Sequence, residues 1–310
     1  MKRTWISGIV GLLALAATPA PQGLDGPVAM VVKVDGEVTV APASSSPGPA
    51  TVGTGVEAGD RIIPSSGASA VLVYRTGATR TVSQEETISE PESTEERDLF
   101  NRTVQVLAQA AGTDARARPN RQGMIRPLPG QPGLISPVND LVVMGQRPTF
   151  AWFSTAGATG YRIQVRVPGE TPKRMEVGAD TVWTWPDTEP PLRRGVTYHW
   201  TVSPVGSGRI APEGRFQVLD SQAGEELEAE LDLLRELGLE PDGDGLFLTA
   251  ILFREWGLPY DAVEALARLE ARGDPVSAPV LYLQGELLDA MGRLEEAGRV
   301  FALADGMATQ

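Results

Sequence analysis

The 310-residue chain contains no cysteine and a single histidine, His199, so two common sources of reactive side chains are almost absent. Without cysteine the chain cannot form disulfide bonds, thiolate metal sites or a cysteine nucleophile. With one histidine it cannot build a multi-histidine metal site, and a Ser-His-Asp triad would have to use His199 as its base. The composition therefore favours a non-enzymatic binding or scaffolding protein, and we expect no cofactor and no metal.

Long apolar runs are also scarce. The main one, residues 6–15, follows a short basic start and overlaps an A-x-A pattern at residues 14–16, which is typical of a cleaved secretory signal peptide. We assign residues 1–20 to this signal. The alternative is a retained membrane anchor, although the run is shorter than the roughly 20 apolar residues that a span needs.

Lysine is rare, since arginine outnumbers it by 24 to 3, a bias typical of a bacterial genome rich in G and C. A secreted eukaryotic protein of this size would usually carry disulfides. We therefore expect the mature chain in the bacterial periplasm or secreted, with no membrane span left after signal removal.

Basic charge is scarcest in residues 220–310, where 20 acidic and six basic side chains give a net charge of −14. Residues 1–111 carry −4 and residues 112–219 carry +5. The arginines of the middle part are scattered and form no stripe, which argues against a nucleic acid partner. The acidic end predicts a basic protein partner, or attraction to the chain's own basic middle; the alternative is a solvated surface.

Glycine and proline are abundant, at 34 and 25 residues, and their turns divide the chain. We expect a multidomain protein, mostly β with an α-helical C-terminal region. Its predicted parts are a small β-sandwich or β-roll at 27–90, a helix at 91–111, a linker at 112–134, an immunoglobulin-like β-sandwich at 135–219 and helical hairpins at 221–306.

The first of these parts consists of short strands separated by glycine turns, such as the Gly59-Asp60 turn. The stretches VDGEV at 34–38, VEAGDRI at 56–62 and GASAVLV at 67–73 resemble the FecR-type periplasmic domain. The resemblance implies an extracytoplasmic interaction domain in which Gly59 and Asp60 are structural. It implies no catalytic chemistry.

Residues 135–219 show the clearest strand alternation, with Tyr161, Ile163 and Val165 predicted to face inward. The stretch LRRGVTYHW at 192–200 resembles the corner of a fibronectin type III domain. The resemblance implies a β-sandwich with structural aromatic residues, in which Tyr198 is the corner tyrosine, Trp152 is the core tryptophan and Trp200 points inward.

The same aromatic residues could alternatively form a carbohydrate-binding platform, which would make the protein a peptidoglycan- or glycan-binding protein of the cell envelope. The alternation along the strands places these side chains on the inward face, which favours core packing instead. His199 lies between two inward residues, so we expect it to face solvent on the outside of the sheet.

The C-terminal region begins with an amphipathic helix from Gln222 to Gly238, followed by hairpins that repeat at an offset of 35 residues. This spacing resembles the tetratricopeptide repeat, whose period is 34. The resemblance gives structural roles to small and aromatic positions, here Gly285, Ala297, Phe301 and Ala304. The alternative is a generic helical bundle.

Stacked hairpins of this kind present a concave face to a peptide or protein. Glu295 and Glu296 are our candidates for contact with a basic partner. The acidic stretch from Glu240 to Gly245 mimics the start of a calcium-binding loop, but the required carboxylate at its twelfth position is replaced by Ile251. We interpret it as an acidic turn that caps the helix from Leu246.

These patterns together predict an exported adaptor or scaffold that binds protein partners at the bacterial cell envelope. The glycan-binding protein is the alternative. A carboxylate-dependent hydrolase is compatible with the composition, but no motif supports it.

Overall fold

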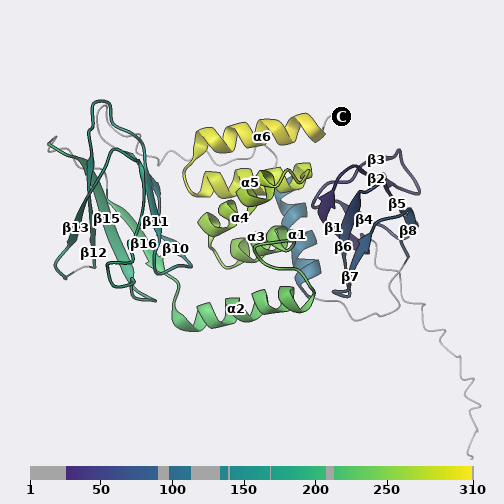
Figure 1. Ribbon diagram of the computed structural model, residues 1–310, viewed down its shortest axis with the longest axis horizontal. Coiled ribbons are helices and arrows are strands. Elements are labelled where there is room, and N and C mark those ends of the chain that lie inside the picture. Colours follow the sequence, from purple (N-terminus) through teal and green to yellow (C-terminus); the bar gives the residue numbers. More distant parts are fainter. Residues whose placement is uncertain are drawn as a thin grey trace, which may run out of the picture.

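The computed structural model describes residues 26–89, 98–112, 133–138, 140–167, 169–206 and 213–308. The predicted signal peptide at 1–20 and most of the predicted linker lie outside the described residues. The fold is multidomain, as predicted, with two β domains and a helical region (Figure 1). The helical region lies between the two β domains, although its longest part comes last in the sequence. Within the described ranges, no helix has the length and apolar character needed to cross a bilayer.

Residues 26–89 fold into a small β-sandwich of two antiparallel sheets. One sheet has the order β4-β1-β6-β7, with the bounds Gly55–Val56, Ala29–Asp35, Ser69–Tyr74 and Thr79–Val82. The other has the order β3-β2-β5-β8, with the bounds Gly48–Pro49, Val38–Ala41, Arg61–Pro64 and Glu86–Thr87. Apolar side chains of both sheets, among them Val34, Ile62 and Leu72, form its core.

The Gly59-Asp60 turn connects two loops of this domain through the Asp60 side chain. Gly59 has a φ of 96°, in the left-handed region that favours glycine. The buried Asp60 carboxylate accepts hydrogen bonds from the backbone amides of Ala43, at 3.0 Å, and Glu57, at 2.9 Å. Asp60 thereby ties the loop after β2 to the turn before β5.

The described part of residues 133–218 forms a second β-sandwich. Its larger sheet has the order β10-β16-β15-β12-β13, with the bounds Leu141–Val143, Gly214–Val218, Thr197–Pro204, Tyr161–Arg166 and Lys173–Val177. Its smaller sheet has the order β14-β11-β9, with the bounds Val182–Thr184, Thr149–Trp152 and Leu134–Ser136. β10 pairs parallel with β16, whereas the other pairs are antiparallel.

Aromatic side chains fill the space between these sheets. Phe150 of β11 meets Trp200 of β15 edge to face, with ring centroids 5.0 Å apart. Tyr198 stacks on Phe216 and its hydroxyl accepts a hydrogen bond from the backbone amide of Arg193 at 2.7 Å. A tyrosine whose hydroxyl returns to upstream backbone is the corner arrangement expected for Tyr198.

The C-terminal part of the chain is helical, as predicted, with α3 and α4 forming one antiparallel hairpin and α5 and α6 another. α2 precedes them. The bounds are Ser221–Glu236 for α2, Leu246–Glu255 for α3, Pro259–Ala271 for α4, Ala278–Ala290 for α5 and Leu294–Ala308 for α6.

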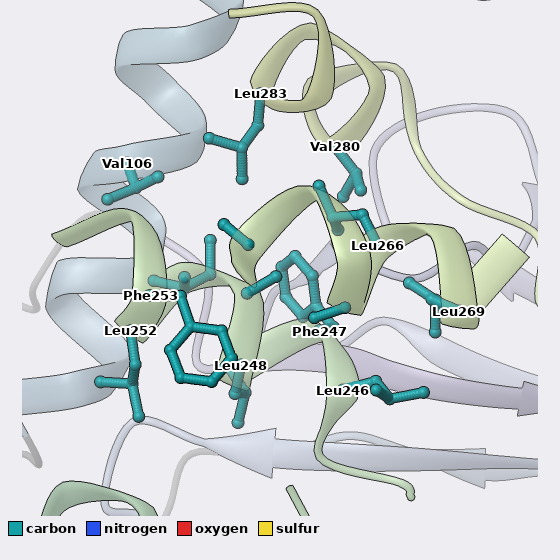
Figure 2. Packing of buried hydrophobic residues seen from close by; sticks show 14 of the residues in the cluster. Val106, Leu246, Phe247, Leu248, Leu252, Phe253, Leu266, Leu269, Val280 and Leu283 are labelled. Carbon is teal, nitrogen blue, oxygen red and sulfur yellow. The ribbon is translucent and has the colours of Figure 1, made fainter. Parts of the chain in front are cut away.

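One helix from the first half of the chain also belongs to this region. α1, Asp98–Gly112, packs against α5 and touches α3. Val106 of α1 and Leu283 of α5 point into the same core as Phe247 of α3 (Figure 2). The sequence had predicted a helix at 91–111 without assigning it a packing partner; residues 91–97 lie outside the described residues.

Backbone and side-chain contacts attach the first β domain to the helical region. Val52 accepts a hydrogen bond from the amide of Ser277 at 2.9 Å and donates to the carbonyl of Pro275 at 2.7 Å. Met30 and Val73 share the helical core. The second β domain is attached through β10 and the residue after it, because Leu141, Val142 and Met144 also pack against that core.

Candidate functional site

The two glutamates predicted to contact a partner lie in the first turn of α6. Glu295 is exposed, whereas Glu296 is half-buried and bound by Arg293 through both carboxylate oxygens, at 2.7 and 2.5 Å. Glu296 and Arg293 also line a hollow of about 410 Å³ between α4, α5 and α6. Glu296 therefore has a structural partner already, and Glu295 is the freer of the two candidates.

The predicted repeat residues are buried between α5 and α6. Ala297, Phe301 and Ala304 are buried on α6, and Gly285 is buried on α5 opposite the Phe301 ring. They pack in the interface between the two helices of this hairpin. None of them is positioned to contact a partner.

α1 covers the face formed by the first helices of the hairpins. Val106, Leu107 and Ala110 of α1 are buried there, with Ala110 only 1% exposed. The sequence predicts that the stacked hairpins present a concave face to a peptide or protein, but this part of the stack is occupied by the chain's own helix. This part of the stack is therefore not open to another chain.

The aromatic residues predicted for the core of the second β-sandwich do not form an exposed ligand platform. Phe150, Trp152, Tyr198 and Trp200 are all buried, as their inward parity predicted. Trp200 donates its indole N–H to the carbonyl of Pro137 at 2.6 Å. The tryptophans therefore serve the core of the domain.

His199 lies on the outer face of the larger sheet, as predicted, but it is half-buried and paired. Its Nδ1 lies 2.6 Å from Oε1 of Glu213, whose other oxygen accepts from Arg166 at 2.6 Å. The hydrogen bond with His199, assisted by Arg166, lowers the pKa of Glu213. His199, Glu213 and Arg166 thus form a hydrogen-bonded cluster on the surface of this sheet.

The acidic turn before α3 contributes an ion pair and no helix cap. α3 begins at Leu246, as predicted, but no side chain of the turn caps it. Asp244 instead pairs with Lys33 of β1 at 3.1 Å and with Arg272 at 3.1 Å. Burial alone would raise the pKa of Asp244, but the hydrogen bonds from these two cations outweigh it and lower the pKa. The turn thus fastens the first β domain to the helices.

A larger cavity, of about 490 Å³, lies between α2, the acidic turn, α3, α4 and Met144 of the second β domain. We call it the acidic cavity. Its lining includes five carboxylate residues and two arginines, which are Glu228, Glu240, Asp242, Asp261, Glu264, Arg235 and Arg268. Sequence reasoning did not single out Asp261, which looks like an ordinary acidic residue in the first turn of a helix.

Asp261 has an unusual environment in this cavity. It is half-buried, and its Oδ2 accepts a long hydrogen bond of 3.4 Å from the backbone amide of Met144. Burial raises the pKa of Asp261 to about 6, and the neighbouring charge of Glu264 adds to the effect. A carboxylate that is costly to ionise, placed in a cavity between two domains, is a candidate binding group.

The acidic cavity also adjoins the hollow beside Glu296, because Glu264 lines both. An apolar cavity of about 410 Å³ lies elsewhere, between β1, β6, α1 and α2. In the described part of the chain, no group of three or more His, Asp or Glu side chains is arranged to hold a metal ion.

No family model and no curated protein matches the chain. Solved structures similar to part of it contain fibronectin type III or Fn3-like domains. An Fn3-like protein from Clostridium thermocellum is 22% identical over 29% of this chain and 93% of its own, with a TM-score of 0.22. The FN1–FN3 domains of chicken CNTN1 are 12% identical over 63% of this chain and 58% of theirs, with a TM-score of 0.23. A two-domain segment of chicken tenascin is 13% identical over 60% and 83%, with a TM-score of 0.21.

Proposed function

We propose that the protein is an exported, non-enzymatic adaptor that binds a basic protein partner at the bacterial cell envelope, in the periplasm or after secretion. The observation that carries the proposal is the acidic cavity at the junction of the helical region with the second β domain. It lies in the most acidic part of the chain, residues 220–310. Long-range attraction by this net charge of −14 would favour the approach of a basic partner.

Two features of the sequence support the rest of the proposal. The basic start and apolar run of residues 1–20 support export. The resemblances of residues 27–90 to the FecR-type domain and of residues 221–306 to the tetratricopeptide repeat support an interaction function. Glycan binding would depend on the sandwich aromatics, and the burial of Phe150, Trp152, Tyr198 and Trp200 argues against it.

The test is fractionation and cross-linking of the full chain in intact bacterial cells. We expect the chain in the periplasmic fraction, cross-linked to a protein, and we expect a variant lacking residues 2–20 to stay in the cytoplasm. Export of that variant would overturn the signal assignment. Recovery of the chain only with sedimented peptidoglycan would replace the adaptor with the glycan-binding protein.

The predicted contact at the start of α6 can be tested in the same cells. Glu295→Lys should weaken cross-linking, because it reverses a charge on the exposed side of that turn. Glu225→Lys reverses the charge of another exposed glutamate, on α2, and is the matched control. Glu225 lines neither the acidic cavity nor the hollow beside Glu296. An equal effect of both variants would mean that only net charge matters.

A further inference from the structure

We infer that the acidic cavity binds the guanidinium group of an arginine side chain presented by the partner protein. The inference rests on the proposed function and deepens it, because it names the group that is recognised and the residues that recognise it.

The carboxylates of the acidic cavity are only partly neutralised. Arg235 pairs with Glu228 at 2.9 Å, and Arg268 pairs with Glu264 at 2.6 Å. Glu240, Asp242 and Asp261 have no ion-pair partner among the described residues. The cavity therefore has three carboxyl groups to offer to a cation, which disfavours an anionic occupant.

A second observation points to a ligand independently of charge. Thr249 of α3 lines the cavity and is 3% exposed, and its Oγ1 has no hydrogen-bond partner. A buried hydroxyl without a partner costs free energy, and such groups are uncommon in folded proteins. The oxygen itself has almost no exposed surface, so a donor in the cavity would reach it, and supply the missing partner, only after a small shift of the side chains around it.

The remaining walls are apolar. Leu231 of α2, Leu246 and Phe253 of α3 and Ala265 of α4 line the same cavity. Arginine and lysine have an aliphatic stem that packs on apolar surface and a charged head that needs polar partners. The combination of apolar walls with carboxylates and a free hydroxyl matches this amphipathic shape.

Arginine fits better than lysine because of the number and spread of the acceptors. A guanidinium presents five N–H donors in a planar fork, and it is less strongly hydrated than an ammonium group. The Asp261 carboxylate and the Thr249 hydroxyl, with Glu240 and Asp242, are acceptors contributed by different elements of the cavity. Several acceptors of this kind can engage one guanidinium.

The experiment is an NMR titration of the full-length mature chain at neutral pH with N-acetyl-Gly-Arg-Gly-amide. The peptide in which citrulline replaces arginine is nearly isosteric and uncharged, and the peptide with lysine tests the ammonium group. We expect shifts of residues around the cavity with the arginine peptide, weaker binding of the lysine peptide and at least about tenfold weaker binding of the citrulline peptide. Equal binding of arginine and citrulline peptides, or no shifts at the cavity, would overturn the inference.

Variants then assign the effect to the cavity. Asp261→Asn should weaken arginine-peptide binding by about tenfold and Thr249→Val by about threefold to tenfold. Glu226→Gln removes the same charge from an exposed position on α2 that does not line the cavity, and should leave binding unchanged. Circular dichroism checks that each variant is folded. If Asp261→Asn binds the peptide as tightly as the unaltered chain, the site is elsewhere.

This inference and the proposed function can fail separately. If cross-linking in cells captures a protein but the cavity variants leave both capture and peptide binding unchanged, the adaptor stands and the cavity is wrong. If the arginine peptide binds as expected while no protein is captured, the cavity stands and the adaptor role is wrong.

Discussion

Gly285 of α5 lies so close to Phe301 of α6 that a Cβ on Gly285 would be 2.4 Å from Cε1 of the ring. Thirty-five residues earlier, the corresponding positions hold Ala250 and Leu266, which are both buried. In one hairpin the smallest residue accompanies an aromatic ring, and in the other a slightly larger residue accompanies a smaller partner. Both hairpins therefore bury a small residue on the first helix and a larger apolar residue on the second at these positions.

Gly285→Ala should destabilise the α5–α6 hairpin by about 1 to 3 kcal/mol through overpacking, although the better helix propensity of alanine offsets part of it. The double variant Gly285→Ala/Phe301→Leu copies the pair of the first hairpin. It should be more stable than the sum of the two single changes predicts. Urea unfolding followed by circular dichroism measures this, and strictly additive effects would contradict the contact.

Asp60→Ala should destabilise the first β domain by about 2 kcal/mol, because it removes the carboxylate that accepts from two backbone amides. The expected change is a lower unfolding midpoint with little change in the helical signal. Glu57→Ala alters an exposed side chain of the same turn and is the control. Equal midpoints for the two variants would show that the Asp60 hydrogen bonds contribute nothing measurable.

Asp261 should make stability depend on pH in a particular direction. Its folded-state pKa of about 6 is above the ordinary value of 3.8, so the folded state binds this proton more tightly. The resulting stabilisation is complete below about pH 3.8 and is lost as the pH rises through 6. Asp261→Asn should therefore gain stability relative to the unaltered chain between pH 4 and pH 7, by at most about 3 kcal/mol. A difference between the two proteins that does not vary with pH would contradict this.

Brief trypsin treatment should cut first between Arg116 and Arg126, in the stretch whose sequence is rich in arginine, proline and glycine. The two fragments should nevertheless remain together in size-exclusion chromatography. The reason is that α1 lies in the first fragment and packs against α5 in the second, while Val52 bonds to the backbone on either side of Val276. Fragments that separate without denaturant would show that these contacts are too weak to hold the parts together.

The local elements could be predicted from the sequence because their signals are local. Alternation along β12 and the corner tyrosine Tyr198 identify a sandwich, and the 35-residue offset identifies the hairpins. The placement of α1 could not be predicted, because residues 113–277 separate it from α5. Its apolar stripe, with Phe100 and Leu107, did indicate that some partner had to cover it.

The acidic cavity was missed for a related reason. In the sequence Asp261 resembles any acidic residue at the start of a helix. Only the folded structure brings the backbone amide of Met144, from the second β domain, to its carboxylate. The one available signal was Thr249, a polar residue inside the apolar run LFLTAILF of α3. A hydroxyl in such a run is often satisfied by the preceding turn of its own helix, so its lack of a partner required the coordinates.

Because α5, near the end of the chain, packs against α1, the helical region can be completed only late in synthesis. The first β domain and α1 leave the ribosome before the second β domain and the remaining helices, yet the surface of α1 stays without its partner until α5 has been made. Domains that are contiguous in sequence can close one after another as they emerge, whereas this helical region cannot. A nascent chain stalled before residue 278 would therefore lack the helix against which the apolar face of α1 packs.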